Sequence, residues 1–350
     1  MWLAPQASRL IAIALWPVSC YVLFVFAGLE AIFRLMDTLN HQHAEYSALE
    51  VVLITLSALP LKLYEHLPLI ILIATATSLG ILAKNSELTI LRAAGLSRKF
   101  IIGLVSLHFV PVFVVALVIG EYGVPDAQRY HQALVEESSY AVPERIWTRE
   151  NQAFVAIDLT SGGLPSLRTE YAYDRTSQTI RSLTTSGINR AGDSVLTWLP
   201  LARTEFSDLE VKLVDPSQVR AAVDYVATDL VLISQHPSLL RTSELWRVVS
   251  YLEREGLNAR YHEQSLWTRL LLPITLVVLI CLASVTAFGS FRHLDLASRV
   301  FIAVVAGLIY RYLIDLSAPL TFLLGLHPAT AAVLPLLIPL TLTPFLGRLR

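Results

Sequence analysis

Few residues of this chain have the types and spacing that catalytic chemistry needs. It contains four lysines and none follows a glycine, so the sequence holds no P-loop for nucleotide phosphates. His262-Glu263 lacks the second histidine of a zinc protease motif. Cys20 and Cys281 both lie in apolar stretches and form neither a paired zinc motif nor a disulfide framework. We therefore expect no catalytic residue, no metal site and no cofactor in this chain.

The remaining candidates are ionisable residues inside long apolar stretches, where a charge is costly and often marks function. Arg311 stands in the middle of one such stretch, and Asp315 follows four residues later on the same helical face. Two interpretations stay open: the two side chains only pair with each other, or Arg311 faces a polar cavity. A membrane-embedded, lipid-modifying enzyme that uses this pair is a further alternative.

A second group of ionisable residues lies near the end of the first apolar stretch. Glu30 and Arg34 have the i, i+4 spacing of an ion pair, and His41 follows closely. Such residues either extend their charges to the membrane surface or contact a ligand. The same choice, between an exposed helix face and ligand contact, applies to Arg129 and His131.

The elements that must position these residues follow from composition. Hydrophobic residues make up 54% of the 350-residue chain, which is more than soluble proteins contain. Between Glu121 and Gln264 there are 14 Lys/Arg and 20 Asp/Glu, so the flanking regions are nearly pure hydrocarbon. This pattern predicts an integral membrane protein with one water-soluble insertion, and the net charge of −1 gives no basis for nucleic-acid binding.

Six stretches are long and apolar enough to cross about 30 Å of hydrocarbon. The first is predicted as a span and not as a signal peptide, because its apolar run is long and no small-residue cleavage site follows. Gly80 and Gly307 are typical of close helix packing. The predicted spans are 10–29, 67–83, 100–119, 270–288, 299–316 and 329–346. For the second span an earlier start is the alternative, because residues 51–59 are also apolar and run into Pro60, where the helix would bend.

The positive charges predict how these spans are oriented. The connection 84–99 carries four Lys/Arg, whereas the connections 35–50 and 317–328 carry none, so both termini are expected in the cytoplasm. That orientation puts the insertion on the opposite, periplasmic side. Within the cytoplasmic connection a short helix is expected at about 85–95, with Asn85 or Ser86 as its cap and Gly95 as its stop.

The insertion alternates polar and apolar residues with the period of β-strands and is interrupted by turn residues. It is predicted as a small antiparallel sandwich or open barrel. After residue 243 the period becomes helical, with Leu245, Val248, Val249 and Leu252 on one face. The expected strands are Arg145–Arg149, Ala153–Asp158, Leu167–Tyr173, Thr179–Thr184, Val195–Thr204, Glu210–Val214 and Val219–Val226.

The order of these parts, together with specific residue runs, resembles the LptF/LptG family of lipopolysaccharide export permeases, and within it the LptG type. The most diagnostic run includes Gly80, Lys84-Asn-Ser-Glu-Leu and Arg92-Ala-Ala-Gly. Further similar stretches are 120–125, 146–157, 247–267, 318–320 and 334–335.

The resemblance implies a division of the chain into helices 1–3 (1–120), a periplasmic β-jellyroll-like domain with return helices (121–265) and helices 4–6 (266–350). It also implies a non-catalytic permease subunit in the bacterial inner membrane. Its partners would be an LptF-type permease, two LptB-type ATPase subunits that hold ATP and Mg²⁺, and the single-span LptC. Together they would pass lipopolysaccharide to a periplasmic bridge. The sibling LptF-type subunit is the near alternative, and a mere tether for the β domain is a more distant one.

Residue roles follow from the same resemblance. Glu87 corresponds to a glutamate that contacts the ATPase, and Ser86, Leu88 and Arg92 lie in the same helix. Arg34 corresponds to a basic position that faces lipopolysaccharide phosphates. The chain departs from some relatives, which carry lysines where Asn40 and His41 stand, and Arg311 is an additional charge. We expect phosphate recognition to be shared among cations of this chain, because arginine suits phosphate geometry. The candidates are Arg34, His41, Arg311 and Arg129.

Overall fold

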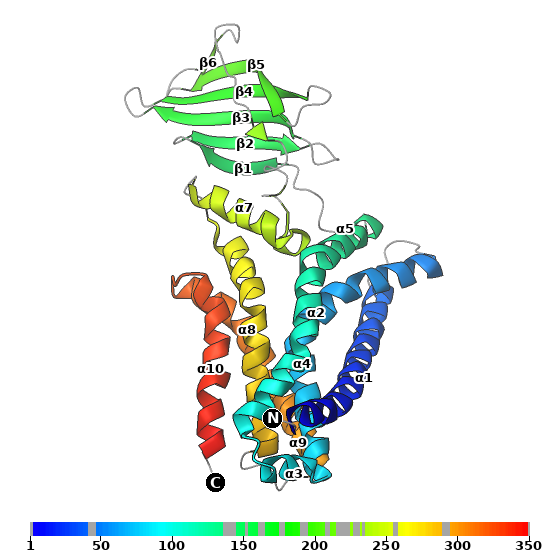
Figure 1. Cartoon of the computed structure of the whole chain (residues 1–350). Helices are drawn as coiled ribbons and strands as arrows, with labels where there is room; N and C mark the ends of the chain where they lie inside the picture. The colour runs from blue at the N-terminus through cyan, green and yellow to red at the C-terminus, as the bar shows by residue number, and fades with distance from the viewer. Residues whose placement is uncertain are drawn as a thin grey trace. The chain divides into compact units, whose positions relative to one another are not determined.

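The structure is a computed structural model whose helices and strands are drawn in Figure 1. It describes residues 3–40, 47–135, 145–150, 153–159, 165–174, 179–189, 195–206, 211–214, 225–226, 232, 235–254, 258–288 and 295–348. The chain packs as two units. The first, the helical unit, comprises Met1–Leu134 and Glu263–Arg350, and the second, the strand-containing unit, comprises Val135–His262.

Long apolar helices make up the helical unit, joined by short connections (Figure 1). A π-helical turn, η1, links α4 to α5, so that the chain stays helical through the expected end of the third span. The elements are α1 (Leu3–Asn40), α2 (Ala48–Lys84), α3 (Glu87–Ala93), α4 (Arg98–Val118), η1 (Ile119–Gly123), α5 (Val124–Leu134), α8 (Arg260–Phe288), α9 (Leu296–Leu323) and α10 (Ala329–Arg348).

Among the described residues, five helical segments are long and apolar enough to cross a membrane, which confirms five of the six predicted spans. They run through α1, α2, α4 with η1 and α5, α8, and α9. The sixth predicted span falls on α10, whose described apolar part is the shorter Ala329–Thr341, so this span stays a prediction. The helices are longer than predicted: α2, with 37 residues, extends about 55 Å. The added part of α2 contains the apolar stretch 51–59, which is joined to the predicted span because the helix continues through Pro60 and Pro68.

Helix α2 is the centre of the helical unit. In its most apolar stretch 72% of the residues are buried, against 17% in α1 and 22% in α9. Its side chains from Leu69 to Leu82 form one apolar core with residues of α1, α4, α8 and α9. The helix continues through Pro60 and Pro68 without ending. Its neighbours in the bundle therefore take their positions from α2.

Two glycines let other helices approach α2 closely, as predicted for Gly80 and Gly307. A Cβ atom at Gly307 of α9 would collide with the Leu69 side chain of α2. A Cβ atom at Gly80 would lie 2.9 Å from Leu296 Cδ1 at the start of α9. The two glycines therefore mark one long contact between α2 and α9.

The strand-containing unit holds a seven-stranded antiparallel sheet with the order β1-β2-β3-β4-β5-β6, and β7 pairs with β5. Strands follow each other in chain order, as short hairpin connections require. An antiparallel sheet is thus confirmed, whereas the jellyroll arrangement stays a prediction. Residues 219–224 of the last expected strand lie outside the described part. The strands are β1 (Arg145–Glu150), β2 (Ala153–Leu159), β3 (Pro165–Asp174), β4 (Thr179–Asn189), β5 (Val195–Phe206), β6 (Val211–Val214) and β7 (Tyr225–Val226).

The chain returns from the sheet through a short 3₁₀ helix, η3 (Pro237–Leu239), and helix α7 (Thr242–Arg254). The apolar face predicted for this region is confirmed, because its four side chains are buried in α7. These residues are Leu245, Val248, Val249 and Leu252.

The close contact at Gly307 gives a test of the helix packing. Gly307→Ala should lower the stability of the folded protein by about 1–3 kcal/mol, because the added methyl group overpacks against Leu69. Gly103→Ala is the matched control, since a Cβ atom there meets nothing within 4 Å. Thermal unfolding of the purified protein in detergent should show a lower midpoint for the first variant alone. Equal midpoints for both variants would contradict the packing described.

Candidate substrate and coupling sites

The connection between α2 and α4 contains the short helix α3, which spans Glu87–Ala93 and is shorter than the predicted 85–95. Ser86 occupies the cap position with a φ of 61°, and its side chain makes no capping hydrogen bond. The expected capping by Ser86 is therefore wrong, because its left-handed backbone turns the chain sharply after α2 and leaves the side chain out of reach. Glu87 lies in the first turn of α3 as predicted.

Gly95 ends α3, as its position predicts. Its φ of +93° favours glycine over residues with a Cβ atom. The Gly95 amide donates to the Arg92 carbonyl at 3.0 Å, and the Leu96 amide donates to the Leu91 carbonyl at 3.2 Å. This pair of bonds is a Schellman motif, in which the apolar residues Leu91 and Leu96 both pack on the core. The connection between α2 and α4 therefore has a defined backbone conformation, held by its own hydrogen bonds and by contacts with the core.

The side chains of α3 divide into a packed face and an open face. Leu88 is 4% exposed and belongs to the core of the helical unit. Glu87 is half-buried beside it, whereas Ser86 and Arg92 are exposed. Ile90 is 65% exposed, which is unusual for an apolar side chain. Figure 1 shows α3 at the end of the helical unit where α1 begins and α10 ends.

Arg34 and Glu30 do not pair with each other, contrary to the prediction from their spacing. Glu30 Oε1 lies 3.5 Å from His66 Nδ1 of α2, and the Glu30 side chain is only 16% exposed. Arg34 Nη1 lies 3.7 Å from Asp37 Oδ2, three residues further along α1. Glu30 faces the helix packed against α1, which draws it toward His66 and leaves Arg34 to a partner nearer the helix end.

Arg311 forms the pair that its spacing predicts and also reaches a second helix. Its Nε atom lies 3.2 Å from Asp315 Oδ2. Its Nη2 atom lies 4.0 Å from Glu65 Oε2 of α2, and the same oxygen accepts from Lys62 Nζ at 2.9 Å. Two cations and two carboxylates thus form one network across α2 and α9. We call these four residues the α2–α9 charge network.

The α2 half of this network, Lys62 and Glu65, is not among the residues predicted from the sequence, and neither is the neighbouring His66. All three ionisable residues nevertheless fall within five positions of an apolar helix. That concentration is the signal that could have found them, because ionisable residues at membrane depth tend to be functional.

Arg129 lies on α5, where its Nη1 atom is 3.5 Å from Asp126 Oδ1. His131, two residues later, connects α5 to α2. Its Nδ1 atom is 3.0 Å from the Ser57 hydroxyl and 3.1 Å from the Ile54 carbonyl oxygen. His131 is thus a packing residue of the helix that leads toward the strand-containing unit, and Arg129 belongs to the exposed side of that helix.

These contacts define what the cations can do. The side chains of Lys62, Arg34 and Arg311 are 25%, 31% and 33% exposed, so each keeps part of its charge accessible. Partly exposed pairs contribute little to stability, about 0–1 kcal/mol. His41 lies outside the described residues, and no group of three or more metal-binding side chains occurs within the described part.

Comparison with known proteins agrees with a transport protein of several membrane helices. A profile of the family described as "Lipopolysaccharide export system permease LptF/LptG" matches residues 14–348. A protein of Escherichia coli (strain K12) named "Lipopolysaccharide export system permease protein LptG" is 25% identical over 346 residues, covering 94% of each chain. A protein of the same name from Haemophilus influenzae is 23% identical over 343 residues, covering 90% of each.

Helices long enough to span a membrane, cations held among apolar helices and a β insertion together define a polytopic permease. Since the profile match extends over nearly the whole chain, this protein belongs to the LptF/LptG family of lipopolysaccharide export system permeases.

Proposed function

We propose that this chain is the LptG-type permease subunit of a lipopolysaccharide exporter. The observation that carries the proposal is the match over almost the entire length to relatives that are named LptG. An LptF-type subunit would have the same topology, and identification of the partner permease in the assembled complex separates the two.

Energy for transport would come from a separate LptB-type ATPase. The sequence contains no P-loop, so any ATP-driven step has to act on this chain through a contact surface. Helix α3 supports that role, because Leu88 anchors it to the core of the helical unit while Arg92 and Ile90 stay exposed. A rigidly anchored helix transmits a push better than a mobile loop would. In this proposal Glu87, Ser86 and Arg92 form the coupling surface, and Leu88, which was predicted to be part of it, is buried and holds the helix in place.

We propose a bacterial inner-membrane location with both termini in the cytoplasm. The segment between α2 and α4 contains Lys84, Arg92 and Arg98, whereas the connection between α9 and α10 carries no lysine or arginine. This asymmetry of positive charge supports a cytoplasmic position for the α3 side. The strand-containing unit is then periplasmic. There a jellyroll-like domain would pass lipopolysaccharide to the periplasmic bridge. LptC would insert its single helix beside α1.

The substrate would bind through the phosphates of lipopolysaccharide. Arg34 and Arg311, with Arg129 and His41, are the cations proposed for this role, and Lys62 joins them because it shares Glu65 with Arg311. Arginine donates to phosphate in a bidentate way, which makes it a strong partner for such groups. When no phosphate is bound, the carboxylates of Glu65 and Asp315 form ion pairs with Arg311.

Glu87→Ala should abolish most transport while leaving the protein folded. The half-buried Glu87 lies at the start of α3, where a carboxylate contributes about 0.3–1 kcal/mol to stability through the helix dipole, so a large transport defect would reflect lost coupling. Co-purification of the ATPase and ATP-dependent lipopolysaccharide release are the measurements. Arg98→Ala, at the start of α4, is the control for a general change of charge. Normal ATPase association and full transport by Glu87→Ala would refute the coupling role.

Arg34→Ala should reduce photo-crosslinking of lipopolysaccharide to the outer end of α1. The variant lacks the partly exposed positive charge of Arg34. The negative charge of Asp37, which is the present partner of Arg34, remains and repels phosphate. Asp37→Asn serves as the companion variant, because it should retain or raise crosslinking. Unchanged crosslinking in Arg34→Ala would make Arg34 a residue that only extends its charge to the membrane surface.

A further inference from the structure

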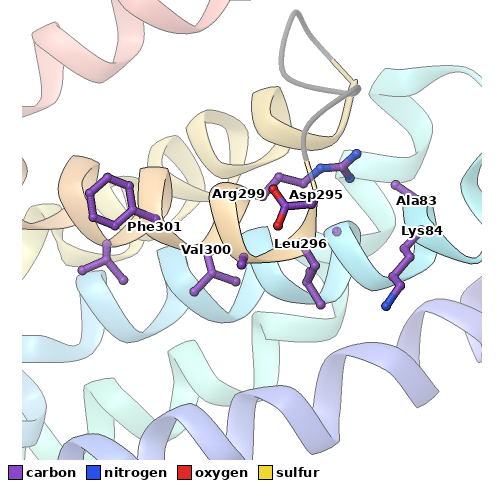
Figure 2. A pocket seen from close by; sticks show the side chains of 10 residues that line it. Ala83, Lys84, Asp295, Leu296, Arg299, Val300 and Phe301 are labelled. Atoms are coloured by element: carbon purple, nitrogen blue, oxygen red, sulfur yellow. The ribbon is translucent and has the colours of Figure 1, made fainter.

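A cavity of about 1010 Å³ lies between the C-terminal end of α2 and the start of α9. It is formed within the helical unit, away from the α2–α9 charge network and from α3. Gly80, Ala83 and Lys84 contribute the α2 side. In Figure 2 the side chains of Leu296 and Val300 extend from α9 toward the side on which the Lys84 side chain of α2 lies. Asp295 and Arg299 lie at the beginning of α9. We call this space the Lys84 cavity.

One wall of the Lys84 cavity is an apolar stripe. Leu296, Val300 and Val304 are spaced at i, i+4 and i+8 along α9 and are each half-buried. Phe301, which also lines the cavity, is 68% exposed. Gly80 leaves room for Leu296 on the α2 side of the cavity, because a Cβ atom at position 80 would press on the Leu296 side chain. The stripe runs from the helix start, where the charges lie, into the apolar span.

The mouth of the cavity carries three charged residues. Lys84 is exposed in the last turn of α2, and no ion pair of its ammonium group occurs among the described residues. Arg299 is 5% exposed, so its charge lies within the protein. A hydrogen bond from the Ser298 hydroxyl lowers the pKa of Asp295, which keeps this carboxylate ionised. Among the described residues that line the cavity, Lys84, Arg299 and Asp295 are the charged ones, and their charges sum to a net charge of +1.

We propose that the Lys84 cavity holds one acidic phospholipid of the cytoplasmic leaflet, with its phosphodiester on Lys84 and an acyl chain along the Leu296–Val300–Val304 stripe. Both halves of the ligand are matched: a cation stands at the polar end, and an apolar groove continues into the hydrocarbon. The net charge of +1 suits a headgroup with a single negative charge, such as phosphatidylglycerol. The glycerol hydroxyls of this headgroup donate hydrogen bonds to Asp295. A zwitterionic headgroup would also contact Asp295, but it has no net charge to balance the +1 of the cavity mouth.

This site rests on the proposed orientation, which puts Lys84 at the cytoplasmic surface, but not on lipopolysaccharide being the cargo. A small free anion would use Lys84 and leave the apolar stripe empty. A lipid uses both, and the continuity of the stripe with the charged mouth favours it. The α3 surface proposed for the ATPase is separate, because Ser86 and Arg92 do not line the cavity.

The test uses the full chain, with its native partners, in isolated inner membranes. Phosphatidylglycerol with a photoactivatable diazirine in one acyl chain is added, and the labelled peptide is mapped by mass spectrometry. The wild type should be labelled within 296–304. Lys84→Glu should reduce this labelling at least about fivefold, because a charge-assisted contact becomes a repulsion. Ala297→Trp, which fills the cavity from an exposed position, should also reduce it.

Lys99→Glu is the matched control, since Lys99 is exposed in the same connection and does not line the cavity. Equal loss of labelling in Lys84→Glu and Lys99→Glu would overturn the proposal, as would full labelling of Ala297→Trp. Equal labelling by a phosphatidylethanolamine probe would overturn the charge preference. Loss of labelling with millimolar glycerol 1-phosphate would identify a site for free anions instead. Lipopolysaccharide crosslinking at Arg34, measured in parallel, reports on the proposed cargo independently.

Discussion

The burial of α2 is the constraint on which the rest of the helical unit depends. Its apolar core from Leu69 to Leu82 is enclosed by four other helices, and the glycines at 80 and 307 bring α9 directly against it. A helix with satisfied backbone hydrogen bonds can be buried in this way without cost to its polar groups. Charged residues flank this buried stretch on both sides: Lys62 and Glu65 precede it, and Lys84 follows it.

Several charged residues in the described part of the chain lie where two helices meet. Glu30 meets His66 across α1 and α2, and Arg311 meets Glu65 across α9 and α2. Ionised groups near hydrocarbon are retained only when a partner or water is within reach. The same argument applies at the opposite end of α2, where Lys84 stands at the mouth of an apolar cavity.

Much of this architecture could be predicted from the sequence, where the signal was local. Five spans, most strand positions, the buried face of α7 and the stop at Gly95 all depend on periodicity or on single turn residues. The Arg311–Asp315 pair was predictable because both residues lie on one helix. Glu65 and His66 were not, because their partners come from other helices and no local pattern encodes which helices pack together. The start of α2 lies at Ala48, well before the predicted 67, because the helix continues through Pro60 and Pro68; α9 ends at Leu323, beyond the predicted 316.

The central claim is that this chain is a non-catalytic permease that carries lipopolysaccharide when a separate ATPase drives it. The most direct measurement is lipopolysaccharide release from proteoliposomes that contain this chain and its partner permease, with and without the ATPase subunit. The account predicts ATP-dependent release only when the ATPase is present, and no ATP hydrolysis without it. Hydrolysis of ATP by this chain alone, or equal release without the ATPase, would contradict the account.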